Sequence, residues 1–534
     1  MSPLTLRRIA VVTIVAFPIG AWTLTASLMS GYPLSGWKVS TIVYFLRITP
    51  EYPLLYVAAA IGLVFALGLI ILLSRISRRT EGFAGARYTR FVRGTETVTA
   101  KRLTAMCKEP NKVQVTVGGI PMPTEVENLH LMIGGATGAG KSVLLRELAA
   151  SVHARGDRMI VIDPNGDLMS KFWKDGDVIL NPYDSRTQGW SFFNEIRADY
   201  DYKRLAQSMV PISQDKNGET WNGYGRLLLR ETAKKIHHMM GPRSSIYDLF
   251  RLCTIEPVDD IRNFLTGTLA ESLFVGSSES SRALSSARFV LSDKLAEHTT
   301  MLQGRFSIRD WLADPKDSNL YINWREDMME SMKPLVSAWT DVFITSILSM
   351  PEDRNRRWWL FIDELASLDA LPSLEAGLTK GRKNGLRIVA GLQSTSQLDH
   401  IYGQTKATTI RASFRNLVVM GGSKTDPKTA RDMSDSLGEH EVEREEYSRS
   451  RSEDSRNRSD RPVRNTEKVV TPSEIQALPA MTGYVAFAGD RPIAKVSMRY
   501  TNYGMRVRPF EESKERMQGT SLPSTLSPEL LEQQ

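Results

Sequence analysis

Residues 129–163 read LHLMIGGATGAGKSVLLRELAASVHARGDRMIVID, and this stretch decides the fold. Its apolar runs at Leu129–Ile133 and Met159–Asp163 have the length and composition of buried strands. Between them, the apolar spacing over Lys141–His153 predicts a helix that ends near Gly156. A strand, a helix and a second strand in this order form a βαβ unit with parallel strands. The sequence therefore predicts an α/β fold.

A glycine-rich turn joins the first strand to the helix. The pattern GxxxxGK[ST] is satisfied by Gly135, Ala136, Thr137, Gly138, Ala139, Gly140, Lys141 and Ser142. Such glycines let backbone N–H groups surround phosphates, and the helix N-terminus adds a positive dipole. We expect Lys141 to lie near the β and γ phosphates of ATP and Ser142 to bind Mg²⁺. The alternative is a helix-entry turn without a ligand, which the flanking strand and helix disfavour.

A second motif ends in two acids. Residues 358–364 read WWLFIDE, an apolar strand followed by Asp363 and Glu364. We expect Asp363 to hold the Mg²⁺ ion and Glu364 to orient the attacking water. A hydrophobic strand that ends in an acid is common, so its pairing with the phosphate-binding loop carries the interpretation. Consecutive acids favour hydrolysis over nucleotide binding alone.

Three further segments fall where ligands of open α/β folds bind, or close to it. Gln393 follows a strand at Arg387–Leu392 and could sense the γ-phosphate, or it could simply cap the next helix. Arg382 lies in a basic segment and could enter a neighbouring subunit's site as an arginine finger, or it could belong to a solvated helix end. Asp163–Asp167 (DPNGD) could shape the site or only turn the chain.

Two apolar runs near the start, Ile9–Ser30 and Tyr52–Leu73, are each long enough to cross a membrane as a helix. The alternative for the first run is a secretory signal peptide, but the run is too long and a second one follows. Arginines flank the outer ends of this hairpin, so the positive-inside rule places both termini and the main body in the cytoplasm. These arginines are Arg7, Arg8, Arg75, Arg78 and Arg79.

Bulk composition restricts the function only weakly. A formal net charge of +8 and a pI near 9.2 permit nucleic acid or anionic lipid as a partner. Cys107 and Cys253 are far apart and belong to no Cys/His cluster, so neither a disulfide framework nor a zinc site is predicted.

The rest of the chain alternates between strand and helix signals. Helical spacing replaces them between about Gln188 and Arg305. Strand signals resume at Trp358–Asp363, Arg387–Leu392, Asn416–Met420 and Gly483–Phe487. Glu439–Asn465 is charged and nearly devoid of apolar residues, so we expect a solvated loop or a flexible excursion there.

Together, these motifs resemble those of the type IV coupling proteins of conjugative plasmids, particularly the TraD/TrwB-like branch. The resemblance is carried by the membrane hairpin, GGATGAGKS (134–142), VIDPNGD (161–167), LFIDELASL (360–368) and GLTKGRKNGLRIVAGLQSTSQL (377–398). It implies a RecA-like ring of six subunits around a DNA channel, with catalytic roles for the residues at its motif positions. These residues are Lys141, Asp363, Glu364, Arg382 and Gln393.

The predicted organisation follows from the motifs and the resemblance together. It comprises a membrane hairpin at 1–79 with spans at about 9–30 and 52–73, a RecA-like nucleotide-binding domain at 80–187 and 306–516, an all-α insertion at 188–305, and a flexible tail at 517–534.

The resemblance also implies a location and partners. It places the protein in the bacterial inner membrane, in contact with a relaxase, accessory DNA-processing proteins and the inner-membrane components of a type IV secretion system. Some relatives dock DNA-processing proteins with a long acidic tail, and we expect another surface to serve here. The function that the resemblance implies is an ATPase that pumps DNA. Two alternatives remain: a receptor that recruits relaxase with ATP as an assembly switch, and a protein-translocating ATPase.

Overall fold

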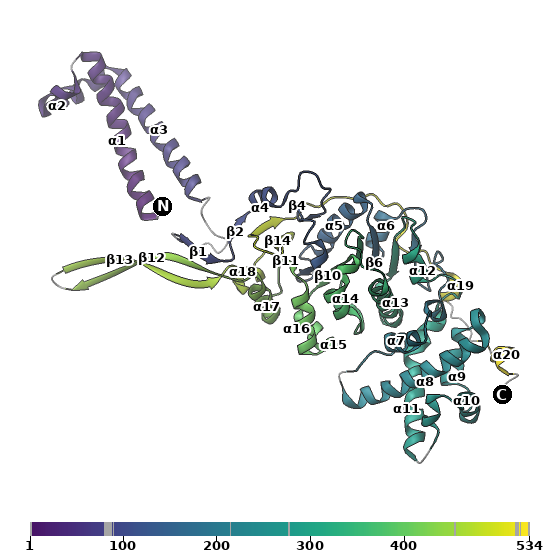
Figure 1. Cartoon of the computed structure of the whole chain (residues 1–534). Helices are drawn as coiled ribbons and strands as arrows, with labels where there is room; N and C mark the ends of the chain where they lie inside the picture. Colours follow the sequence, from purple (N-terminus) through teal and green to yellow (C-terminus); the bar gives the residue numbers. More distant parts are fainter. Residues whose placement is uncertain are drawn as a thin grey trace. The chain divides into compact units, whose positions relative to one another are not determined.

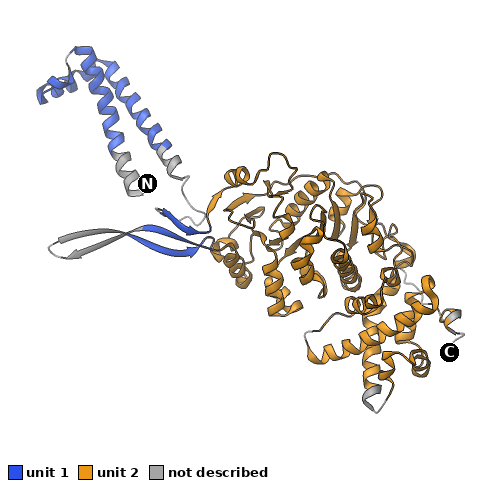
Figure 2. Cartoon of the chain, in the orientation of Figure 1, with its two compact units in different colours: residues 1–95, 439–469 blue, residues 96–438, 470–534 orange. Residues whose placement is uncertain are grey.

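The computed structural model describes residues 3–31, 33–78, 88, 90–213, 215–275, 278–452, 455–517, 523 and 525–531. The chain forms two compact units (Figure 2). One comprises residues 1–95 and 439–469, and the other comprises residues 96–438 and 470–534.

A ten-stranded sheet is the centre of the larger unit (Figure 1). Seven neighbouring strands are parallel, and all their residues are buried except the two ends of β6. In spatial order they are β11 (Asn416–Met420), β5 (Leu131–Gly134), β10 (Leu386–Leu392), β9 (Trp358–Ile362), β6 (Arg158–Pro164), β8 (Leu320–Trp324) and β7 (Val178–Ile179). The antiparallel strands β14 (Thr482–Ala486) and β15 (Ile493–Ser497) and the short β2 (Thr97–Thr99) extend the sheet beyond β11. Near-continuous apolar runs are what a sheet covered on both faces requires.

Alternate strand residues face opposite layers of helices, because side chains in a strand alternate between faces. Leu144, Leu148 and Val152 of α5 (Lys141–Arg155) share one core with Ile133 and Val161. On the other face, Gly377 of α14 packs against Ile344 of α13 and approaches Ile388 of β10. Besides α5, the α/β body contains α4 (Ala100–Cys107), α6 (Asp167–Phe172), α12 (Ile308–Ala313), α13 (Met329–Ser349), α14 (Leu374–Lys380), α15 (Thr395–Tyr402), α16 (Gln404–Ser413), α17 (Pro427–Leu437) and α18 (Pro472–Gln476).

In the segment between β7 and α12 the described residues form helices joined by loops, with isolated bridges at Asp184 and Trp190. Its helices are α7 (Asp199–Met209), α8 (Lys216–Met240), α9 (Ile246–Thr254), α10 (Val258–Leu265) and α11 (Ser278–Ala296). The chain enters and leaves this segment through a narrow neck, where the Phe306 N–H donates to the Gly189 carbonyl at 3.0 Å. A Cβ on Gly304 would lie only 2.6 Å from the Gly189 Cα, so the neck accepts no side chain at that position. The expected α/β fold with an inserted helical segment is thereby confirmed.

The described part of the C-terminal segment is packed, which differs from the predicted flexible tail. Beyond α19 (Lys514–Met517), the short helix α20 (Pro528–Leu531) lies against the helical segment. Leu526 and Leu530 are buried. The Ser527 N–H and hydroxyl both donate to the Asp248 carboxylate of α9, at 2.9 and 2.7 Å. A short run with two apolar residues gives too weak a periodic signal for this docking to be read from sequence.

The smaller unit contains the two candidate membrane spans. α1 (Pro3–Ser30) and α3 (Pro53–Arg78) pack along one another, and the windows Val12–Ser30 and Pro53–Leu72 have mean hydropathies of 1.6 and 2.7. The short helix α2 (Val39–Ile48) lies in the connection between them.

The same unit holds a three-stranded antiparallel sheet of β1 (Arg90–Gly94), β12 (Glu439–Ser452) and β13 (Ser455–Lys468). The prediction of a loop at Glu439–Asn465 is therefore wrong, because the described residues of this segment form two paired strands. Ion pairs across the strands take the place of apolar alternation, as in Arg464–Glu443 at 3.0 Å, and opposite charges on facing residues stabilise a strand pair.

Candidate nucleotide site

The phosphate-binding loop is anchored on both sides. β5 ends at Gly134, and the loop runs from Gly135 into α5. The Gly135 N–H donates to the Leu392 carbonyl at the end of β10, at 3.1 Å. The Ala136 N–H donates to the Gly421 carbonyl, just beyond β11, at 2.8 Å. Gly140 caps α5 with φ of 109°, a backbone conformation that favours glycine. The loop is therefore held between the two strands that flank β5.

Lys141 lies at the start of α5 with only 8% of its surface exposed. Its ammonium donates to the loop carbonyls of Gly135 and Ala136, at 2.8 and 3.4 Å. Burial lowers the pKa of Lys141, while the nearby Glu364 and Asp363 raise it. The site thus keeps one cation between the loop and a pair of acids.

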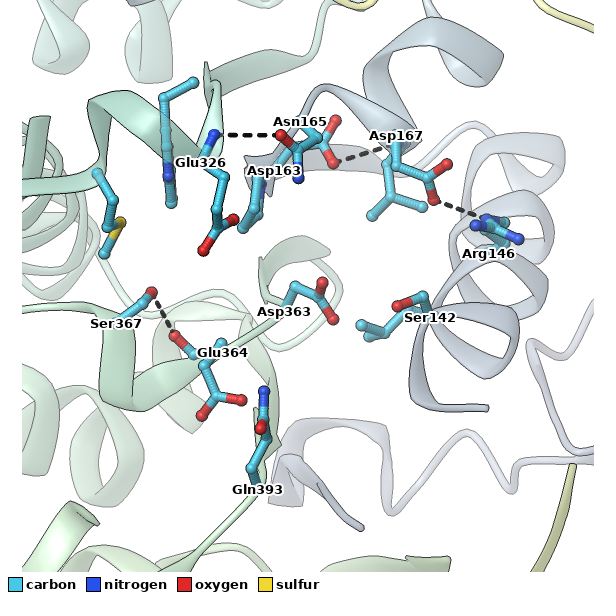
Figure 3. A pocket seen from close by; sticks show the side chains of 15 residues that line it. Ser142, Arg146, Asp163, Asn165, Asp167, Glu326, Asp363, Glu364, Ser367 and Gln393 are labelled. Atoms are coloured by element: carbon cyan, nitrogen blue, oxygen red, sulfur yellow. Dashed lines mark hydrogen bonds and ion pairs between the residues drawn. The ribbon is translucent and has the colours of Figure 1, made fainter. Parts of the chain in front are cut away.

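The two acids follow β9, which is separated from β5 by β10 alone. Burial raises the pKa of Asp363 above its usual range, and Lys141 opposes this shift. Burial likewise raises the pKa of Glu364, while Lys141 and the Gln393 amide lower it. Both carboxylate oxygens of Glu364 are buried and have no hydrogen bond of normal geometry to any described residue. The Glu364 carboxylate lies beside the Gln393 side chain (Figure 3), and its unpaired oxygens can accept a hydrogen bond from a water molecule.

Gln393 connects the two motifs. It follows β10, and its amide oxygen accepts a hydrogen bond from the Thr137 hydroxyl of the loop at 2.9 Å. The alternative that Gln393 only caps the next helix is wrong, because the cap of α15 is Ser394, whose hydroxyl accepts from the Ser396 N–H at 3.3 Å. Gln393 therefore lies between the phosphate-binding loop and Glu364.

A cavity of about 420 Å³ opens beside these groups (Figure 3). The Ser142 hydroxyl and the Asp363 carboxylate face one another in it. Among the described residues no cluster of three or more His, Cys, Asp or Glu could hold a metal. The Ser142 hydroxyl and the Asp363 carboxylate fit Mg²⁺, which takes one or two protein oxygens and completes its octahedron with phosphate and water oxygens. The cavity is lined by Ser142, Leu145, Arg146, Asp163, Pro164, Asn165, Asp167, Leu168, Trp324, Glu326, Met329, Asp363, Glu364, Ser367 and Gln393.

The DPNGD segment both lines this cavity and turns the chain. The Asp163 carboxylate accepts the N–H groups of Leu168 and Met169, at 3.0 and 2.7 Å, and thereby caps α6. Burial raises the pKa of Asp163 to about 7. Asp167 forms an ion pair with Arg146 at 2.6 Å. The segment therefore both shapes the site and turns the chain.

Two charged residues that line the cavity, Arg146 and Glu326, are not marked by any sequence motif. Arg146 lies four residues after Ser142, so helical spacing places both on the same face of α5. Glu326 follows β8, and acids that follow parallel strands reach the same edge of the sheet. Arg382, in contrast, is exposed in the turn after α14 and does not line the cavity of its own chain.

Comparisons with known proteins agree with this architecture. The family model described as the type IV secretion-system coupling protein DNA-binding domain matches residues 114–499. Coupling protein TraD of Escherichia coli (strain K12) is 30% identical over 420 residues, which are 75% of this chain and 57% of TraD. The chain therefore matches little more than half the length of that relative.

Solved structures are more similar still. The unbound conjugative coupling protein TrwBdeltaN70 is 58% identical with a TM-score of 0.77, over 81% of this chain and 100% of that one. TrwB in complex with ADP and Mg²⁺ is 59% identical with a TM-score of 0.75, over 81% and 99% of the two chains. The fold is thus RecA-like, and the chain belongs to the family of type IV secretion-system coupling proteins.

Proposed function

We propose that this chain is a membrane-anchored ATPase that couples a relaxase–DNA complex to a type IV secretion channel and pumps DNA during conjugation. One observation carries the proposal: Ser142, Asp363, Glu364 and Gln393 follow three neighbouring strands and line one cavity. The Lys141 ammonium lies close enough to both acids to shift their pKa values. Such a site suits phosphoryl transfer, in which the protein mainly positions groups and stabilises charge.

Each residue then has a distinct task. The loop N–H groups and the Lys141 ammonium hold the β and γ phosphates of ATP. Ser142 and Asp363 hold Mg²⁺, which neutralises charge on the phosphate oxygens when bound. Glu364 accepts a hydrogen bond from the attacking water, and its raised pKa keeps the proton affinity of this base high. Gln393 donates its amide N–H toward the γ-phosphate. The relative bound to ADP and Mg²⁺ supports this choice of ligands.

The assembly we propose is a hexamer in which Arg382 completes the site of the next subunit. Within one chain, Lys141 and Arg146 are cations that lie at or near the cavity, and Arg146 is already paired with Asp167. An exposed arginine supplied by a neighbour would stabilise the charge that develops on the transferred phosphate. ATP bound between subunits would then link hydrolysis to movement around the ring.

DNA is the cargo that the family model favours, since it describes a DNA-binding domain. The net charge of +8 agrees with contacts to phosphates, which are independent of sequence and weaken steeply with salt. We further propose that both termini and the main body lie in the cytoplasm, with α1 and α3 as the two spans.

The test is ATP hydrolysis by the full chain in lipid nanodiscs, with single-stranded DNA, double-stranded DNA or none, across a salt series. We expect salt-sensitive stimulation by DNA. Lys141→Ala should lose nucleotide binding, whereas Glu364→Gln should bind ATP, keep its assembly and lose hydrolysis. A rate of ATP hydrolysis that DNA does not change but relaxase increases would overturn the DNA pump. It would favour the receptor or the protein-translocating ATPase.

A further inference from the structure

The connection between α1 and α3 contains a helix with three chemically different faces. α2 spans Val39–Ile48. One face carries Phe45, which is buried, and Ile48, which is half-buried. Both belong to a cluster with Trp22 of α1 and Leu55 of α3. This face fixes α2 to the ends of both long helices.

The anchorage is specific as well as apolar. The Trp37 ring stacks on Phe45 with centroids 5.0 Å apart and an interplanar angle of 10°. Trp22 meets Trp37 edge to face, with centroids 6.2 Å apart. The Trp22 indole N–H donates to the Thr49 hydroxyl at 3.2 Å, at the C-terminal end of α2. Aromatic packing and a buried hydrogen bond leave α2 little freedom to rotate about its own axis.

The second face is apolar and uncovered by the described parts of the chain. Val39, Ile42, Val43 and Leu46 are 77, 40, 44 and 58% exposed. Their spacing of three, one and three residues places them in one stripe of the helix. A contiguous apolar stripe of this kind marks a contact surface rather than a face in water.

The third face is polar. Ser40, Tyr44 and Arg47 follow one another at steps of four and three, and all three are exposed. Lys38, which precedes the helix, is exposed as well. An apolar stripe on one side, a polar stripe on another and a cation at each end are the features of a helix that lies in a membrane interface.

We propose that α2 lies in the membrane surface, in the leaflet opposite to the chain's termini, with its apolar stripe among the acyl chains. Lys38 and Arg47 then meet lipid phosphates, and Tyr44 lies at headgroup level. This rests on the proposed membrane anchoring. Lipid is the occupant because the ends of the two candidate spans that α2 joins also expose apolar side chains, such as Leu28 and Leu54, which are 76 and 55% exposed. Held by its aromatic cluster, α2 would set how deep the two spans sit.

The test uses spin labels on single cysteines in the full chain, in vesicles of phosphatidylethanolamine and phosphatidylglycerol. Val43→Cys and Leu46→Cys report on the apolar stripe, Ser40→Cys on the polar face, and Val64→Cys on the middle of α3. Collision rates with oxygen, which concentrates in lipid, and with a water-soluble nickel chelate are compared at each site. Unmodified chain gives the background of Cys107 and Cys253, which are both buried.

We expect oxygen to exceed nickel at Val43, Leu46 and Val64, and nickel to exceed oxygen at Ser40. If the label at Val43 collides with the nickel chelate as often as the label at Ser40 does, while Val64 stays in lipid, the proposed position of α2 is wrong. The membrane anchoring would then still hold. Low access of both reagents at Val43 and Leu46 would show a protein contact, such as a second copy, and would also overturn the proposed position of α2. Nickel access at Val64 would sink the membrane anchoring itself.

Discussion

The Thr137 hydroxyl donates a 2.9 Å hydrogen bond to the Gln393 side chain, which ties the phosphate-binding loop to the end of β10. Because Gln393 also adjoins Glu364, one amide touches both the loop and the base. Its oxygen is occupied by Thr137, so its N–H₂ group is oriented toward the cavity and Glu364 (Figure 3).

Replacing Gln393 with Ala should lower kcat for ATP hydrolysis by about 100-fold, the typical loss when a donor to developing charge is removed. Nucleotide affinity should change little, because the loop and Lys141 are intact. Steady-state rates and nucleotide titrations measure the two effects. Thr137→Val is the matched control and should retain most activity. An equal loss in both variants would mean that orientation of the loop, rather than contact with the phosphate, is what Gln393 supplies.

Arg382 should act in trans. Arg382→Ala and Lys141→Ala should each be inactive alone, since one lacks the finger and the other lacks the lysine. Rings that contain both kinds of subunit would include some interfaces with an intact Lys141 on one side and an intact Arg382 on the other. Mixing the two variants should therefore restore measurable DNA-stimulated hydrolysis. Arg382→Ala that stays fully active would remove the residue from catalysis.

A buried ion network should be necessary for folding. Glu127 is 1% exposed and accepts from Arg155 at 2.6 and 3.0 Å and from Arg387 at 3.1 Å. Glu127→Ala leaves two arginines without their shared anion and should cost about 3–5 kcal/mol of unfolding free energy. Thermal unfolding of the full chain measures this.

The neighbouring Glu125 provides the comparison. Its side chain is 69% exposed and pairs with Arg491 at the surface. Glu125→Ala should cost less than about 1 kcal/mol, because water already screens this pair. Similar losses for the two variants would contradict the role of burial.

Asp163 should make stability depend on pH. Its pKa is raised to about 7 in the folded chain from the ordinary value of 3.8. The folded state thus binds a proton more tightly than the unfolded state, so this group's contribution falls as the pH rises from about 4 to 7. The slope is at most about 1.4 kcal/mol per pH unit. Asp163→Asn, compared with the unmodified chain at pH 5 and pH 8 without Mg²⁺ or nucleotide, should lose part of this dependence. If Tm changes with pH by the same amount in both proteins, the contribution of Asp163 to this pH dependence is refuted.

The docked C-terminal segment should detach when Asp248 is changed. Asp248→Ala removes both hydrogen bonds to Ser527, so amide exchange at Ser527 and Leu530 should accelerate. Hydrogen exchange followed by mass spectrometry of the C-terminal peptide measures this. Asp259→Ala on α10, an exposed residue paired with Arg262, is the matched control and should leave that exchange unchanged.

Strong local signals made the central sheet and the main motifs predictable. Buried parallel strands are continuous apolar runs, and the glycine-rich turn has a fixed spacing between its strand and helix. The role of Gln393 stayed open at that stage because Gln393 and Ser394 are both plausible caps. Only the hydrogen bonds of Ser394 and Thr137 distinguish them.

Features that depend on tertiary partners could not be predicted. The strands β12 and β13 contain charges where apolar alternation is the usual signal, and their pairing depends on which glutamate faces which arginine. Docking of Leu526 and Leu530 depends on the surface of α9, which lies far away in the sequence. Glu326 and Asp327 are consecutive acids that follow a strand, as Asp363 and Glu364 do, but Arg325 separates them from the end of that strand.

The strand order also determines when the strands of the sheet can pair during synthesis of the chain. β5 pairs only with β10 and β11, and β6 pairs only with β9 and β8, so every partner of these early strands follows the helical insert. A ribosome adds roughly 5–20 residues per second, so β5 waits on the order of ten seconds or more for a neighbour. The insert, with its local contacts, can fold within that interval, while the phosphate-binding loop still lacks the Leu392 and Gly421 carbonyls that anchor it. During synthesis this protein therefore carries a finished helical domain in the middle of an unfinished nucleotide site.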